Sequence, residues 1–229
     1  MDALGLIREQ AALCESQGVS ILCSPEAILG GLADLSDEPT KLAIRTADGE
    51  LDQVLAPLRS PVVTTIIGFT ELAADGNLYN SAAVLHRGVV TGVYRKHYPA
   101  RRRSVYAAGR ESTVFDVNGV RFAVIICNDS NYVQPAKAMA ERGAAVLFVP
   151  SNNALPAERA SAGIVRETRK VDVTRAAENQ AWVIRADVAG QQGELLAYGT
   201  SAVVDSTGKV VIEASANNPE LLIVDLPFY

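Results

Sequence analysis

Three residues with chemically useful side chains each come directly after a strand-like segment of the sequence. Cys127 follows the largely apolar run 121–126 and precedes a polar stretch, whereas Glu26 comes shortly after segment 19–23 and Lys96 directly after segment 89–95. Functional side chains are concentrated in loops that a rigid scaffold positions, such as those at the ends of strands. A thiol, a carboxylate and an ammonium group are therefore candidates for one active site.

These three groups together have the parts needed for nucleophilic attack on a carbonyl or nitrile carbon. A thiol attacks as its thiolate and is mostly protonated near neutral pH, so it needs a base such as Glu26. Burial would raise the pKa of that carboxyl group and a nearby ammonium would lower it. Lys96 would favour the thiolate and, with the backbone N–H of Asn128, would hold the oxyanion of a tetrahedral intermediate.

Each residue also has a structural interpretation. A lone cysteine at a strand end is usually a small buried hydrophobe, a glutamate after proline usually caps a helix, and a lysine after a strand usually lies in solvent. The shared position of the three at the ends of strand-like segments favours the catalytic hypothesis, although it does not prove that they meet.

The elements that must position these residues are mostly strands. Because strands outnumber helices, two packed sheets with helices outside fit better than one doubly wound sheet, so we predict an α/β fold of the α-β-β-α sandwich type in a single domain, 1–229. The Asn118-Gly119 pair predicts a tight hairpin. Helices are predicted at 3–17, 51–58, 135–142 and 156–180, and strands at 19–23, 62–71, 79–86, 89–95, 113–117, 120–126, 144–149, 181–188, 200–205, 209–213 and 221–225.

Composition argues against several classes of function. The net charge is −5 and the longest block of like charge is 101–103, so neither a nucleic-acid nor a membrane surface is indicated. Without a leader or a spanning apolar stretch, we expect a cytoplasmic protein that binds a small molecule. Three cysteines and two histidines without ligand spacing predict reduced thiols and no metal site.

Several residues are candidates for substrate contacts. Arg101 could grip a substrate carboxylate, although a solvated loop or a dimer contact is the stronger alternative. Asn152 and Asn153 could line the pocket or cap the next helix, and Tyr132 could be a pocket wall or ordinary core. His97 is adjacent to Lys96, so the two side chains would point apart in an extended segment, which disfavours a Cys–His pair.

The segments 24–26, 94–97 and 125–129 together resemble the three signature blocks of the nitrilase or carbon–nitrogen hydrolase superfamily. Segments 175–180 and 199–208 resemble two further blocks, so the resemblance covers nearly the whole chain. It implies an α-β-β-α fold, often a homodimer or higher homo-oligomer. It also implies hydrolysis of a non-peptide C–N bond through an acyl-enzyme, without metal or organic cofactor. In that mechanism Glu26 is the base, Lys96 stabilises the intermediate and Cys127 is the nucleophile.

Three features depart from the family pattern. Residues 96–109 contain no acidic residue where many members carry a second glutamate, and Glu111 is the nearest candidate. The family's usual first strand is missing before the first predicted helix. Asn128 takes the place of the aromatic residue that commonly follows the nucleophile, which affects the shape of the substrate more than the thiol chemistry.

We therefore expect a thiol-dependent hydrolase of a small amide or carbamoyl compound. Nitrile hydrolysis or acyl transfer by the same three residues is the alternative within this chemistry. A non-catalytic binding or assembly module that keeps the fold is the alternative outside it.

Overall fold

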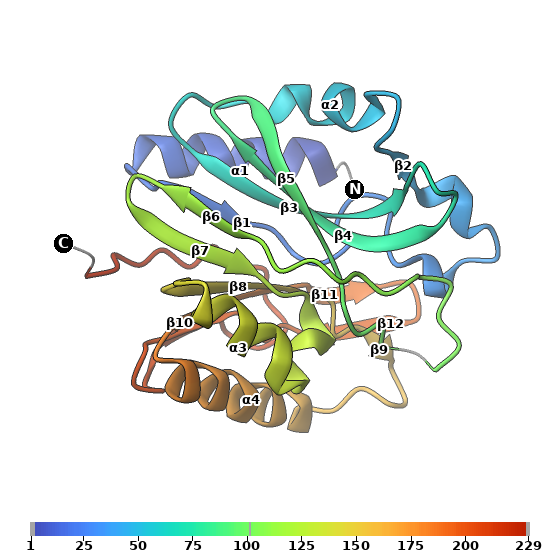
Figure 1. The fold of residues 1–229 in the computed structure, drawn as a ribbon. Coiled ribbons are helices and arrows are strands. Elements are labelled where there is room, and N and C mark those ends of the chain that lie inside the picture. The colour runs from blue at the N-terminus through green and yellow to red at the C-terminus, as the bar shows by residue number, and fades with distance from the viewer. Residues whose placement is uncertain (1–2, 101, 228–229) are drawn as a thin grey trace. The chain divides into compact units, whose positions relative to one another are not determined.

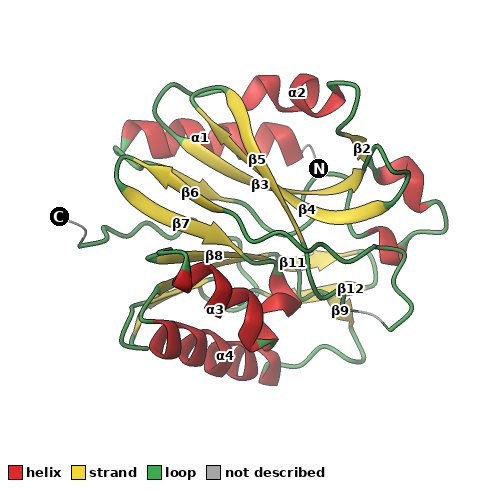
Figure 2. Cartoon of the chain, in the orientation of Figure 1, coloured by secondary structure: helices red, strands yellow, loops and turns green. Residues whose placement is uncertain are grey.

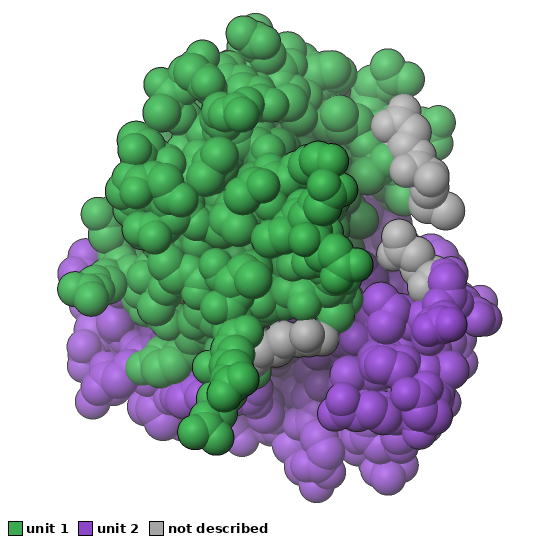
Figure 3. Space-filling model, turned by 90° about the vertical axis from the view of Figure 1, so that its right-hand side faces the viewer, with its two compact units in different colours: residues 1–111 green, residues 112–229 purple. Residues whose placement is uncertain are grey.

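The computed structural model describes residues 3–100 and 102–227. The chain forms two compact units, Met1–Glu111 and Ser112–Tyr229, which Figure 3 colours green and purple. Each unit contains one larger sheet together with helices (Figures 1 and 2).

The sheet of the first unit contains a three-stranded antiparallel meander. Its strand order is β1-β3-β4-β5, with β1 parallel to β3, and a short strand β2 also pairs in parallel with β3. Helix α1 buries Ile7, Ala11 and Cys14, which recur at helical spacing. The elements are α1 (Ala3–Ser16), β1 (Ile21–Cys23), the 3-10 helices η1 (Ala33–Leu35) and η2 (Pro39–Leu42), β2 (Ile44–Arg45), α2 (Glu50–Leu55), the 3-10 helix η3 (Ala56–Leu58), β3 (Thr64–Leu72), β4 (Leu78–His86) and β5 (Val89–Arg95).

The main sheet of the second unit has a parallel centre with antiparallel strands on both sides. Its order is β14-β13-β10-β8-β7-β6, and β7, β8 and β10 run parallel. Helix α4 packs against α3 and β10. The elements are β6 (Val114–Val117), β7 (Val120–Val124), the 3-10 helix η4 (Cys127–Asn131), α3 (Val133–Glu141), β8 (Val146–Ser151), β9 (Leu155–Pro156), α4 (Gly163–Asn179), β10 (Trp182–Asp187), β11 (Ala189–Gln192), β12 (Leu195–Tyr198), β13 (Ala202–Val204) and β14 (Val210–Glu213); β9, β11 and β12 form a small separate sheet.

The parallel centre determines where functional side chains gather in the second unit. The carboxyl ends of neighbouring parallel strands lie at the same edge of a sheet. The residues that follow β7 and β8, together with the last residues of β10, therefore share one edge. Cys127 follows the first of these strands, Asn152 and Asn153 follow the second, and Asp187 ends the third.

Tight turns that require left-handed backbone are where the sequence predicts them. The predicted hairpin between β6 and β7 is confirmed, and Asn118 and Gly119 both have positive φ there. Arg87 and Gly88 turn the chain from β4 to β5 in the same way.

Other parts of the fold differ from the sequence predictions. Helix α4 begins at Gly163 rather than 156, because β9 and a turn precede it. The strand predicted at 221–225 is wrong, since this segment is neither helix nor strand. Its continuous apolar run, 221–224, fits a strand, but a strand also needs a neighbouring edge to pair with, which a local pattern does not encode. The hairpin of β11 and β12 was not predicted.

The longest helix, α4, has 17 residues and is rich in charged side chains. Within 3–100 and 102–227, no helix combines the length and apolar character needed to cross a membrane.

Candidate active site

In the first unit, the structure brings Glu26 and Lys96 into direct contact. The Nζ atom of Lys96 lies 2.6 Å from Oε1 of Glu26, and the two side chains are only 3% and 2% exposed. Asn80, in β4, donates from Nδ2 to the same carboxylate oxygen at 2.7 Å. Two donors on one oxygen hold the Glu26 side chain in a fixed orientation.

The segment that carries Glu26 runs along β3 after β1 ends. Its backbone is held by hydrogen bonds from Ser24 N to Ile66 O (2.9 Å) and from Leu29 N to Gly68 O (3.1 Å). Gly68 is required for this close approach. A Cβ atom at this position would collide with the carbonyl oxygen of Pro25 and would lie 2.7 Å from the backbone nitrogen of the residue after Glu26.

Lys96 is fixed by its backbone as well as by its ammonium group. Its N–H donates to the carbonyl oxygen of Asn80 at 2.9 Å, and its own carbonyl oxygen accepts from Gly109 N at 2.8 Å. Asn80 therefore contacts both members of the pair. Asn80 is not among the residues predicted from the sequence, although a polar side chain within the largely apolar strand β4 is a signal that points to it.

A second buried carboxylate anchors the end of β5 next to Lys96. Glu71 accepts hydrogen bonds from Nε of Arg95 (2.9 Å) and from its NH2 group (2.6 Å), and also from Ser81 Oγ (2.6 Å). The hydrogen bonds to Glu71 raise the pKa of Arg95, although burial acts in the opposite direction. Arg95 also lies over the ring of Tyr79, 4.2 Å from its centroid.

In the second unit, Cys127 is the first residue of η4 and has a φ of 43°. A positive φ is uncommon for a residue with a side chain and is found mainly where the surrounding structure enforces it. Two contacts do so here: Asp129 Oδ2 accepts from Ile126 N at 2.9 Å, and Ser130 Oγ donates to the carbonyl oxygen of Cys127 at 2.7 Å. The thiol is half-buried at the edge of the sheet.

The thiol faces a side-chain amide whose own contacts are extensive. Sγ of Cys127 lies 3.7 Å from Oδ1 of Asn153. The Nδ2 group of Asn153 donates to Asp187 Oδ2 and to Thr200 Oγ1, each at 3.1 Å, and its backbone N–H donates to Asp187 Oδ1 at 3.0 Å. The predicted candidate Asn153 is therefore next to the proposed nucleophile, and its amide is held by Asp187 and Thr200, two residues that the sequence patterns do not indicate.

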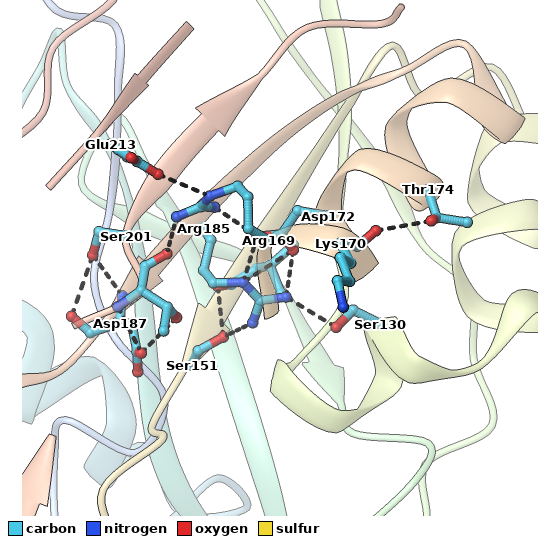
Figure 4. Close-up of polar contacts among 12 residues, drawn as sticks. Ser130, Ser151, Arg169, Lys170, Asp172, Thr174, Arg185, Asp187, Ser201 and Glu213 are labelled. Carbon is cyan, nitrogen blue, oxygen red and sulfur yellow. Dashed lines mark hydrogen bonds and ion pairs between the residues drawn. The ribbon is translucent and has the colours of Figure 1, made fainter. Parts of the chain in front are cut away.

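A buried ion pair supports η4, the short helix that begins at Cys127 (Figure 4). Arg185 donates from Nη2 to Asp172 Oδ1 at 2.5 Å and to Ser130 Oγ at 3.0 Å, and it also contacts Ser151. Burial favours the neutral form of Arg185, but the charge and hydrogen bonds of Asp172 dominate and raise its pKa, with a smaller contribution from the charge of Cys127. The attraction is mutual, so Arg185 favours the thiolate. An arginine within the apolar strand β10 was the sequence signal for this pair.

The other predicted contact residues have different positions. Asn152 Oδ1 accepts from Ala154 N at 3.2 Å, so it forms a turn; the alternative that it caps the next helix is wrong, because α4 begins at Gly163. Tyr132 is 43% exposed and therefore not core. The Asn128 side chain accepts from Asn131 Nδ2 at 3.0 Å. Arg101 lies outside the described residues.

Metal-ligating side chains do not gather in the part of the chain that the structure describes. No group of three or more histidine, cysteine, aspartate or glutamate residues there could hold a metal ion.

Comparisons with known proteins give one consistent family. A sequence model for a family described as carbon–nitrogen hydrolase matches residues 2–228. The chain is 29% identical over 215 residues to an (R)-stereoselective amidase of Pseudomonas sp, a match that covers 93% of this chain and 75% of the amidase. It is also 29% identical over 218 residues to a glutamine-dependent NAD(+) synthetase of Aquifex aeolicus, which covers 92% of this chain and 37% of the synthetase.

Solved structures agree on the fold. A glutamine-dependent NAD+ synthetase from Acinetobacter baumannii superimposes with a TM-score of 0.81 at 22% identity, covering 95% of this chain and 41% of that one. An amidase of the nitrilase superfamily from Nesterenkonia gives a TM-score of 0.75 at 22% identity, covering 98% and 84%. The predicted nitrilase-type α/β fold is thereby confirmed. The chain spans well under half the length of the synthetases that it matches.

Proposed function

Because the chain belongs to the carbon–nitrogen hydrolase family, we propose that it hydrolyses a small amide or carbamoyl compound through an acyl-enzyme on Cys127. The observation that carries this proposal is the Cys127 thiol at the carboxyl ends of the parallel strands β7, β8 and β10, held at positive φ and facing a fixed amide. A buried cysteine that served only for packing would not need this backbone conformation.

In the proposed reaction, Sγ of Cys127 forms a bond to the carbonyl carbon while its proton passes to Glu26. Lys96 and the backbone N–H of Asn128 hold the negative oxygen of the tetrahedral intermediate. The C–N bond then breaks, and the leaving nitrogen takes the proton from Glu26. Water, deprotonated by Glu26, attacks the thioester, and the acid leaves with Cys127 restored as a thiol.

The buried contact between Glu26 and Lys96 supports their assigned roles. An ammonium 2.6 Å from the carboxylate and largely shielded from solvent can act on charge that develops nearby with little screening. Asn80 would keep the carboxylate oriented while protons arrive and leave. We expect it to position Glu26 rather than to touch the substrate.

The mechanism requires Glu26, Lys96 and Cys127 to share one active site, and a cross-linking test examines this directly. In a Lys96→Cys variant, a bifunctional thiol reagent with a short spacer should join the introduced thiol to Cys127, because the spacer makes up for the shorter cysteine side chain where a direct disulfide would need closer Cα atoms. Peptide mass spectrometry would identify the link. After the protein is unfolded in urea, this cross-link should form no more readily than a cross-link between Cys14 and Cys23. If the link fails to form in the folded protein while both thiols remain reactive, the shared site is refuted.

The substrate is tested by intact-protein mass spectrometry after incubation with primary amides, carbamoyl compounds and nitriles. Glutamine belongs in the amide set, because the chain is similar to enzymes described as glutamine-dependent and the side chain of glutamine is a primary amide. A mass increase equal to one acyl group, absent in Cys127→Ala, is the expected result. Turnover that rises with added amine would favour acyl transfer, and neither adduct nor product with any compound would favour a binding module.

We also propose a homodimer or higher homo-oligomer, as the family resemblance implies. Light scattering on the purified chain at several concentrations tests this, and a monomer at all of them would contradict it.

A further inference from the structure

The side chain of Asn153 is fixed so that its oxygen, and not its nitrogen, faces the Cys127 thiol. Its Nδ2 group lies 3.1 Å from Asp187 Oδ2. An ionised carboxylate has no hydrogen to donate, so only the NH2 end of the amide can face it favourably. The opposite end, Oδ1, is the atom 3.7 Å from Sγ of Cys127.

Thr200 reinforces this orientation. Its hydroxyl donates to Asp187 Oδ2 at 2.6 Å, which uses its one hydrogen, so it must accept the hydrogen bond from Nδ2 of Asn153. The backbone N–H groups of Asn153 and Thr200 also donate to the carboxylate, each at 3.0 Å. Asp187 and Thr200 are buried, so turning the amide over would place its oxygen against a buried carboxylate.

We propose that Oδ1 of Asn153 accepts a hydrogen bond from an N–H group of the substrate, and that the site thereby selects amides and carbamoyl compounds over nitriles and esters. This inference rests on the proposed function and narrows its substrate class. Nitriles and esters have no hydrogen on the atom that the reaction cleaves from carbon, so they would leave this acceptor unpaired.

The distances allow this contact. In a reactive complex the attacked carbon lies about 3–3.5 Å from the nucleophile. A nitrogen bonded to that carbon can therefore come within hydrogen-bond distance of an oxygen that is 3.7 Å from the same sulfur.

The contact also fits the progress of the reaction. In the free enzyme the thiol S–H can donate to Oδ1, but this donor is lost once the proton leaves. The N–H of a bound amide would then replace it. The acceptor would thus favour substrate binding at the stage when the nucleophile becomes charged.

Two alkylating probes of similar size test this without knowledge of the natural substrate. N-methyl-iodoacetamide carries an N–H, whereas methyl iodoacetate has an ester oxygen in its place. In both reactions Sγ of Cys127 displaces iodide, a C–S bond forms and the thiol proton goes to base. Each rate at Cys127 is measured by peptide mass spectrometry on the full chain and is divided by the rate of the same probe with glutathione.

In the wild-type protein, we expect the normalised rate of the amide probe to be roughly ten times that of the ester probe. This is the effect expected from one additional hydrogen bond to a half-buried group. Asn153→Ala should remove this preference. Asn179→Ala should keep it, because that amide donates to the carbonyl oxygen of Arg175 at the end of α4. Equal normalised rates in the wild type would overturn the proposal, and so would a preference that survives in Asn153→Ala.

The comparison within the wild-type protein remains decisive if Asn153→Ala does not fold. Failure of this inference is also distinguishable from failure of the proposed function. If an acyl adduct forms on Cys127 while the two probes react equally, only the role of Asn153 is lost. If neither an adduct nor a product acid forms with any compound of the substrate panel, the hydrolase proposal itself fails.

Discussion

The ammonium group of Lys96 and the carboxylate of Glu26 form a buried ion pair in which Nζ and Oε1 are 2.6 Å apart. Removing one charge from such a pair leaves the other buried without compensation, which costs about 3–5 kcal/mol. Lys96→Met should therefore lower the free energy of unfolding by that amount. The double variant Glu26→Gln with Lys96→Met should recover part of the loss. Urea unfolding measures both.

The exposed pair of Lys41 and Glu38 provides the matched control. These side chains are 72% and 63% exposed, so Lys41→Met should change stability by less than about 1 kcal/mol. Turnover should not recover together with stability in the double variant. Both Lys96→Met and the double variant should lose turnover by roughly 100-fold or more, as happens when an oxyanion donor is removed. Turnover near normal in the double variant would exclude Lys96 and Glu26 from the chemistry.

The three thiols should differ in reactivity in a way that depends on pH. Burial raises the pKa of Cys14 and of Cys23, so both remain protonated and unreactive at pH 7–8, and their labelling should begin only at higher pH. The charges of Cys127 and Arg185 attract each other, which favours the thiolate of Cys127. We expect iodoacetamide to label Cys127 first and at the lowest pH, as followed by peptide mass spectrometry.

Cys127→Ala is the control for this labelling. It should abolish turnover with the fold intact, because it removes the attacking atom. Equal and slow labelling of all three thiols in the wild type would instead support the binding-module alternative.

The sequence was sufficient to predict most of the elements and the candidate nucleophile. Strand ends marked by Cys127 and Lys96, and turns marked by Asn118-Gly119 and Arg87-Gly88, depend on local residue types and were predicted from them. Glu26 and Lys96 are in direct contact, whereas their placement in one active site with Cys127 stays a prediction.

Other features depend on residues far apart in the chain and could not be predicted. Asp172 and Arg185 belong to a helix and a strand whose packing decides whether the two charges meet. The segment 221–225 has a strand pattern, yet no strand forms there, because pairing depends on a neighbouring edge. The orientation of the Asn153 amide likewise depends on Asp187 and Thr200.

The close approach of β3 to the segment that carries Glu26 requires a glycine at position 68, and a substitution can test this. A Cβ atom at this position in β3 would collide with the carbonyl of Pro25, next to Glu26. Gly68→Ala should therefore displace the segment that bears the proposed base. We expect a loss of stability of about 1–3 kcal/mol, as for other overpacked sites, and a larger fractional loss of turnover. Thermal unfolding and steady-state kinetics measure the two effects.

Gly163→Ala is a suitable control for that substitution, because Gly163 begins α4 and a Cβ atom there would meet only flexible side-chain atoms of Ser161 and Arg166. It should leave turnover unchanged. Normal kinetics in Gly68→Ala would show that the placement of Glu26 does not depend on this close approach.

The buried charge of Arg185 makes Asp172 important for the stability of the second unit. Asp172→Asn keeps the shape of the side chain but removes the negative charge that, against burial, raises the pKa of Arg185. We expect a loss of about 3–5 kcal/mol in urea unfolding, because the arginine stays buried and loses its counter-charge. Glu167→Gln, in an exposed pair on the same helix, should cost less than about 1 kcal/mol. Equal effects of the two substitutions would mean that the Arg185–Asp172 pair contributes no more than a surface ion pair.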